Sequence, residues 1–281
     1  MGDAWGFVGW RLMYIVEAVP AVILGVVCYF YLTDHPADAH WLTDKQRTWL
    51  INTLAQEERN KPLVVGVQPT KGQMIRKALC NRQVWLLALV YFGITSGSNA
   101  MNFFMPTVLA SFRGTFGLEI GLMQNGLITA IPYAVAAVAM IWWSRRSDRL
   151  QERHWHAGGA AMLAAVSIAV ALWLNQPWII VIGFILLAMG VYSAINVFWA
   201  VPGQVLTGVG AAVGIGLINS IGNLSGFIGP YLTGYLFTVT GSYTPGFMVI
   251  AALVGLGGLG MVLMPRNKES QIGAALAPAT G

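Results

Sequence analysis

Charged residues are scarce in this sequence. They occupy only 10% of its 281 positions, whereas soluble globular domains average about 25%. Hydrophobic residues make up 56% of the chain, and its 33 glycines lie mostly inside apolar runs. Glycine there does not indicate disorder, because it lets transmembrane helices approach one another closely. The composition excludes an ordinary soluble domain and predicts a protein embedded in lipid.

Residues that carry catalytic and metal chemistry are also few. Cys28 and Cys80 are far apart and form neither a metal-ligand spacing nor a disulfide framework. The motifs H-E-x-x-H, G-x-S-x-G and the P-loop are absent. All histidines fall in predicted loops: His35, His40, His154 and His156. The sequence therefore predicts no metal, no cofactor and no enzyme activity.

What the chain does contain is a series of long apolar segments. A helix needs about 20 apolar residues to cross a bilayer. Seven segments qualify: residues 12–32, 84–108, 121–143, 157–174, 178–201, 209–237 and 246–264. They predict an all-α fold, a polytopic transmembrane helix bundle. In the polar loop between the first two, residues 41–61 predict an amphipathic helix with Thr43 as its N-cap.

The basic residues orient this bundle. Of the 16 lysines and arginines, only Arg11 and Arg113 fall opposite the rest, which lie in the first loop, in the loop after residue 143 and after residue 264. The positive-inside rule makes the basic side cytoplasmic. We therefore predict a multi-pass protein of the inner (plasma) membrane with an extracytoplasmic N-terminus and a cytoplasmic C-terminus. Such a start without a signal peptide suggests that preceding helices are missing.

Three stretches carry a family resemblance. GWRLMYIVEAVPAVILG (9–25) is followed by YLTDHPADAHWLT (31–43), and INSIGNLSGFIGPYLTGYLFTVTGSY covers 218–243. Between them, SRRSDRLQERHWH (144–156) resembles a G-x-x-x-D-R-x-G-R-R loop, in which Asp148, Arg149 and Arg153 match while Glu152 replaces a basic residue. Together these stretches resemble the major facilitator superfamily, and within it the anion:cation symporter branch.

The resemblance implies that the chain holds helices six to twelve of a twelve-helix fold. Residues 1–32 would be the last helix of the N-terminal half, 33–82 the cytoplasmic central loop and 83–265 the six-helix C-terminal half, with a disordered tail at 266–281. It implies proton-coupled transport of organic anions, such as sugar acids or dicarboxylates, by alternating access.

The expected partners are a small organic anion, a proton, the lipid bilayer and a missing N-terminal half. Nucleic acid is not expected, because the positive charge is explained by the cytoplasmic loops. The alternative is a truncated fragment or a membrane assembly subunit with no transport activity alone.

Polar side chains inside apolar spans are the candidate solute ligands, because they are costly in hydrocarbon unless they face a partner or a water-filled cavity. Helical spacing and the resemblance select seven substrate-binding candidates: Tyr91, Asn99, Ser193, Asn196, Trp199, Asn219 and Asn223. Weaker candidates share the faces of the second and fifth segments or form a line of their own on the third segment: Thr95, Ser98, Asn102 and Tyr192, and Asn125, Thr129 and Tyr133. The alternative for all of them is hydrogen bonding between helices.

Charged residues provide two further hypotheses. Glu17 is the only acid within a predicted span, which makes it a candidate for proton coupling, with a structural polar contact as the alternative. By the resemblance, Asp148, Arg149 and Arg153 form a cytoplasmic latch that influences the switch between outward- and inward-facing states.

Overall fold

The computed structural model describes residues 9–60, 70–117, 121–206 and 210–265. The chain divides into two compact units, Met1–Gln68 and Pro69–Gly281. The predicted disorder of residues 266–281 falls outside the described residues.

The first unit contains two long helices. Helix α1 (Gly9–Tyr31) is apolar and includes Pro20, and a short 3-10 turn (Pro36–Asp38) precedes α2 (Asp44–Asn60). The Gln46 backbone N–H donates to Thr43 Oγ1 (3.4 Å), and the Thr43 N–H donates to Gln46 Oε1 (3.1 Å). This reciprocal capping box confirms the predicted N-cap of the helix.

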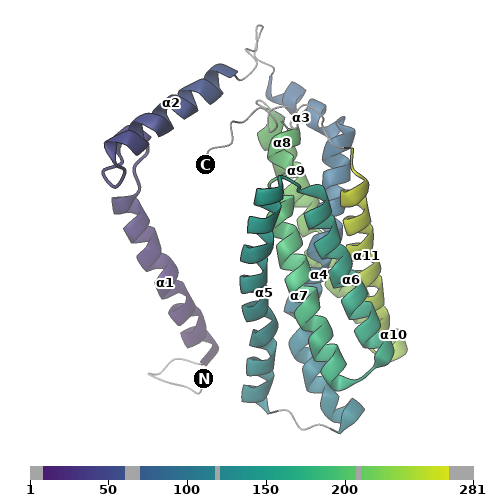
Figure 1. Ribbon diagram of the computed structural model, residues 1–281. Coiled ribbons are helices and arrows are strands. Elements are labelled where there is room, and N and C mark those ends of the chain that lie inside the picture. The colour runs from purple at the N-terminus through teal and green to yellow at the C-terminus, as the bar shows by residue number, and fades with distance from the viewer. Residues whose placement is uncertain (1–8, 61–69, 118–120, 207–209, 266–281) are drawn as a thin grey trace. The chain divides into compact units, whose positions relative to one another are not determined.

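The second unit is a helix bundle (Figure 1). Its helices are α3 (Lys71–Leu79), α4 (Arg82–Phe116), α5 (Leu122–Leu150), α6 (His154–Leu174), α7 (Pro177–Phe198), α8 (Pro202–Val205), α9 (Gly210–Asn223), α10 (Ser225–Thr240) and α11 (Thr244–Leu263). Helix α7 packs against α4, α5 and α6, while α11 packs against α4 and α6. A core of buried side chains from α4, α6, α7 and α11 lies between these helices.

Helix ends in the bundle follow from local sequence. Residues with positive φ follow four helices: Gly117 after α4, Gln151 after α5, Asn175 after α6 and Gly241 after α10. Proline stands in the first turn of α7 and of α11, where its missing N–H is not needed by the helix.

Small residues set the closest helix contacts. A methyl group on Gly190 of α7 would lie 2.4 Å from the Ala160 carbonyl oxygen of α6, and one on Gly93 of α4 would lie 2.5 Å from the Leu253 oxygen of α11. Since lipid tails are as apolar as leucine, close packing of this kind is a main source of helix association in a bilayer.

Among the described residues, seven spans are long and apolar enough to cross a membrane, which agrees with the predicted fold class. The predicted segment 209–237 corresponds to the span Ala211–Thr240, and within it Leu224 forms a tight turn that separates α9 from α10. The prediction also missed α3, and it placed His154 and His156 in a loop although both lie in the first turn of α6.

Candidate functional site

A polar seam joins α4 to the junction of α9 and α10. Asn99 Nδ2 donates to Ser225 Oγ (2.9 Å), and Ser225 Oγ donates to Thr95 Oγ1 (2.9 Å). The Thr95 hydroxyl in turn points to the carbonyl oxygens of Tyr91 (2.7 Å) and Gly222 (3.0 Å). Thr95 and Ser225 are buried, whereas Asn99 is half-buried at the edge of the seam. Thr95 and Ser225 therefore hold α4 against the junction of α9 and α10. Asn99 is the residue of this seam that a solute could reach.

An aromatic cluster lies beside this seam. The Tyr91 ring stacks on Phe198 with centroids 5.0 Å apart and meets Trp199 edge-on at 4.9 Å. Gly222 packs directly against the Tyr91 ring. The structure thus brings together two substrate-binding candidates, Tyr91 and Trp199. Tyr91 is nearly covered by this packing, while Trp199 remains half-buried.

A second polar cluster joins α4, α5 and α7. The Tyr133 hydroxyl donates to Asn102 Oδ1 (2.8 Å), and the Tyr192 ring lies beside the Tyr133 ring. The two tyrosine rings lie 6.0 Å apart between centroids. Asn102 is exposed and both tyrosines are half-buried, so the cluster presents amide and hydroxyl groups at an accessible surface. We define these three residues as the amide–tyrosine cluster.

Sequence reasoning ranked the amide–tyrosine cluster low because its members belong to three separate segments. Each was recognised as polar within an apolar span, but periodicity within one helix does not show which faces of different helices meet. The available signal was the presence of an amide and two phenols near the middle of three spans.

The remaining substrate-binding candidates lie on α9 and α7. Asn223 Nδ2 donates to the Asn219 carbonyl oxygen (2.8 Å) and to its Oδ1 (3.0 Å), and both side chains are exposed on α9. On α7, Ser193 is buried and Asn196 is exposed. Asn219 and Asn223 therefore pair within one helix and still present polar atoms at the surface.

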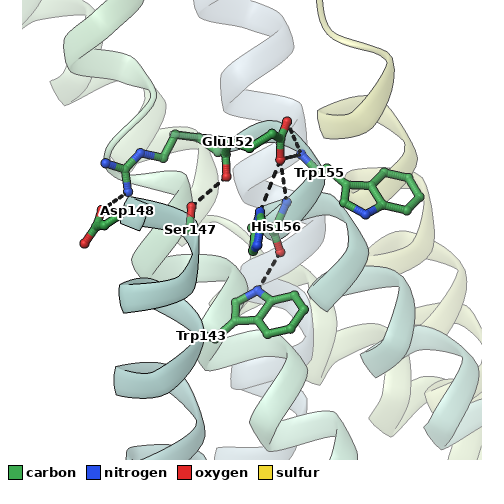
Figure 2. A network of polar contacts seen from close by, with 7 residues as sticks. Trp143, Ser147, Asp148, Glu152, Trp155 and His156 are labelled. Carbon is green, nitrogen blue, oxygen red and sulfur yellow. Dashed lines mark hydrogen bonds and ion pairs between the residues drawn. The ribbon is translucent and has the colours of Figure 1, made fainter. Parts of the chain in front are cut away.

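The turn between α5 and α6 holds a dense network, shown in Figure 2. The Glu152 carboxylate accepts hydrogen bonds from the backbone N–H groups of Trp155 (3.0 Å) and His156 (3.3 Å), and it lies 3.2 Å from His156 Nδ1. Trp143 Nε1 donates to the His156 carbonyl oxygen, and Ser147 Oγ donates to that of Glu152. Glu152 thereby satisfies the otherwise unpaired N–H groups at the start of α6.

The three latch candidates separate in this turn. Arg153 forms an ion pair with Asp148, so these two candidates pair with each other across the turn between α5 and α6. Arg149 is exposed and lines a hollow together with other arginines of α5. Glu17, the proton-coupling candidate, is exposed on α1 in the first unit. Within the described ranges, no three His, Cys, Asp or Glu side chains are grouped to hold a metal ion.

Comparison with protein families decides the class of this bundle. The family model described as Major Facilitator Superfamily matches residues 2–230. The chain belongs to the Major Facilitator Superfamily. It is accordingly a multi-pass membrane protein, and the match points to a transporter family rather than to an enzyme.

Relatives within this superfamily are named as transporters. Two proteins of Agrobacterium vitis, each named "Putative tartrate transporter", are 36% identical over 95% and 97% of this chain. A protein of Acinetobacter baumannii named "Quinolone resistance transporter" is 33% identical over 88% of it. The matches cover 57%, 60% and 55% of those proteins, so this facilitator chain spans little more than half of their length.

Proposed function

We propose that this chain is the C-terminal part of a secondary active transporter for small organic anions, such as sugar acids or dicarboxylates, coupled to protons by alternating access. The observation that carries the proposal is the 36% identity, along nearly the whole chain, to proteins named as tartrate transporters. Tartrate is a dihydroxy dicarboxylate, and its hydroxyl groups are natural partners for amide and phenol side chains.

The polar groups of the bundle support a hydroxylated solute. The amide–tyrosine cluster, Asn99 and the Asn219/Asn223 pair offer neutral donors and acceptors on α4, α5, α7 and α9. Asn196 and Trp199 on α7 are further ligand candidates because they are not buried. We expect these groups to select for hydroxyl pattern rather than for charge.

The charge of the anion requires groups from elsewhere. The six predicted spans after residue 83 contain no lysine or arginine. A carboxylate removed from water without a counter-charge is strongly disfavoured. We therefore propose that an N-terminal half supplies the basic residue, and that residues 1–32 are the last helix of that half. Glu17 remains the candidate for proton coupling, with the Asp148–Arg153 pair and Arg149 as the latch.

The test combines this chain with the part of a relative that lies outside the match. Proteoliposomes would hold the 281-residue chain alone, the segment of an Agrobacterium vitis relative that precedes the matched region alone, or both. We expect uptake of labelled tartrate that depends on an inward proton gradient only when both are present. Including a labelled quinolone tests the activity named for the Acinetobacter relative.

A point variant links uptake to the amide–tyrosine cluster. Tyr133→Phe removes the hydroxyl that donates to Asn102, and we expect KM for tartrate to rise roughly fivefold, the scale of one hydrogen bond. The matched control is Tyr235→Phe, an exposed tyrosine of α10. No uptake by the combined halves, when both are folded, would favour the alternative of a fragment or assembly subunit without transport activity.

A further inference from the structure

The seam between α4 and the junction of α9 and α10 has a direction, because it ends on groups that can only accept hydrogen bonds. Helix α9 ends at Asn223, so the Gly222 carbonyl is among the last four of the helix, which lack partners within it. The Thr95 hydroxyl, 3.0 Å away, supplies the donor. It also lies close to the carbonyl oxygens of Tyr91 (2.7 Å) and Phe92 (3.3 Å). The single hydroxyl proton of Thr95 is therefore used by the backbone.

This use of the Thr95 proton sets the direction of the bonds that follow. Thr95 Oγ1 has only acceptor capacity left, so Ser225 Oγ donates to it (2.9 Å). Ser225 Oγ has then used its own proton and accepts from Asn99 Nδ2 (2.9 Å). A rotated amide would place Asn99 Oδ1 against an oxygen that has no proton to give. We call the bonds from Asn99 through Ser225 and Thr95 to Gly222 the hydroxyl relay.

The hydroxyl relay lies inside the bundle. Thr95 is 5% exposed and Ser225 is fully buried, so their bonds do not depend on what else packs on the outside of these helices. The Asn99 amide rests on Gly226, where an added methyl group would lie 3.5 Å from both Nδ2 and Oδ1. In the described part of the chain, the bond to Ser225 is the one hydrogen bond of the Asn99 side chain. Asn99 Oδ1 therefore keeps its acceptor capacity for a further group.

We propose that Thr95 and Ser225 are positioning residues that make Asn99 an acceptor toward the solute, so that Asn99 binds a hydroxyl group and not a carboxylate. This inference rests on the proposed function, in which Asn99 faces the solute. A hydroxyl group can donate to Oδ1, whereas an ionised carboxylate has only acceptors and is repelled by it. The solute that fits is a dicarboxylate with a hydroxyl group, such as tartrate, in preference to one of the same length without it, such as succinate.

The first test measures selectivity in proteoliposomes that hold this chain together with the preceding segment of the Agrobacterium vitis relative. Unlabelled tartrate or succinate competes with the uptake of labelled tartrate, and the ratio of their inhibition constants gives the preference for the hydroxylated solute. We expect a preference of roughly tenfold, the scale of one hydrogen bond. Equal inhibition by the two solutes would overturn the proposal.

Two variants interrupt the hydroxyl relay without changing Asn99. Thr95→Val and Ser225→Ala each remove a hydroxyl, which releases the Asn99 amide to rotate. We expect the inhibition constant of tartrate to rise severalfold and that of succinate to stay the same, so the preference falls to near parity. Thr95→Ser keeps the hydroxyl and should retain the preference.

The matched control is Ser96→Ala, which removes another buried hydroxyl of α4, one that donates to the Phe92 carbonyl oxygen of its own helix. This variant should leave the preference unchanged. Equal weakening of tartrate and succinate in Thr95→Val and Ser225→Ala would show a merely structural role and overturn the proposal.

A second measurement follows the amide itself and needs no transport. In the full chain, carrying isotope-labelled asparagine in detergent, the Asn99 side-chain signals in nuclear magnetic resonance are those absent from Asn99→Ala. We expect them to shift in Thr95→Val, because the change passes through Ser225 to the amide, and to stay in place in Ser96→Ala. In a Ser225→Ala background, Thr95→Val should shift them no further, because the connection is already lost.

The two measurements separate the hydroxyl relay from the function on which it rests. Asn99 signals that do not respond to Thr95→Val would overturn the relay, whatever the uptake. The expected shifts without any uptake by the combined halves would contradict the proposed function and, with it, the assignment of a solute hydroxyl to Asn99.

Discussion

Single residues determine how closely the helices of this bundle approach, and Gly222 of α9 is the sharpest case. A methyl group at this position would lie 2.0 Å from a carbon of the Tyr91 ring. The ring cannot easily move away, because it is held between Phe198 and Trp199. Well-packed cores tolerate such added volume poorly.

We therefore expect Gly222→Ala to lower the free energy of unfolding by about 1–3 kcal/mol, the usual cost of overpacking. Thermal unfolding in detergent, followed by circular dichroism, measures this loss. The control is Gly216→Ala on the same helix, where an added methyl group meets nothing within 4 Å. Equal melting temperatures of the two variants would contradict the packing argument, and Tyr91→Ala combined with Gly222→Ala should cost less than the sum of the single changes.

At the scale of elements, the start of α6 depends on a residue that departs from the family loop. Glu152 stands where the resembling motif has a basic residue, and its carboxylate accepts from the N–H groups of Trp155 and His156. Negative charge is favourable at a helix N-terminus, where the helix dipole is positive. The departure therefore has a structural reason, since this acid caps the helix that follows it.

Replacing Glu152 by Ala should destabilise the fold by roughly 1–2 kcal/mol, because capped N–H groups and the His156 ring lose their partner. Chemical unfolding monitored by tryptophan fluorescence would measure it. Glu152→Gln should retain part of the stability, since an amide oxygen still accepts. Asp34→Ala, at an exposed position outside the helices, is the control expected to change little. A Glu152→Ala variant as stable as this control would remove the capping role.

Element boundaries show what the sequence could and could not predict. The apolar runs predicted the seven membrane spans, because a bilayer demands about 20 apolar residues regardless of neighbours. They could not predict the break at Leu224, since the seam from Thr95 to the Gly222 carbonyl involves a helix more than a hundred positions earlier in the chain. The amide–tyrosine cluster could not be predicted for the same reason. The periodicity of one helix does not show which residues of other helices it contacts.

At the scale of the whole molecule, the orientation in the membrane is a prediction that rests on charge alone. The basic loops and the turn that contains Glu152 follow the positive-inside rule if α4 begins on the cytoplasmic side. Alternation then places the junction of α6 and α7 outside. Chemical labelling of cysteines can test this orientation, because the free cysteines Cys28 and Cys80 are exposed.

A Cys28→Ser variant keeps Cys80, which lies between α3 and α4, as the single thiol. In right-side-out vesicles, we expect a membrane-impermeant maleimide to label Cys80 only after permeabilisation, since the lipid barrier separates reagent and thiol. A cysteine-free background with Gln176→Cys, exposed just before α7, should be labelled without permeabilisation. The reverse labelling pattern would place the basic loops outside the cell and contradict the orientation predicted from charge.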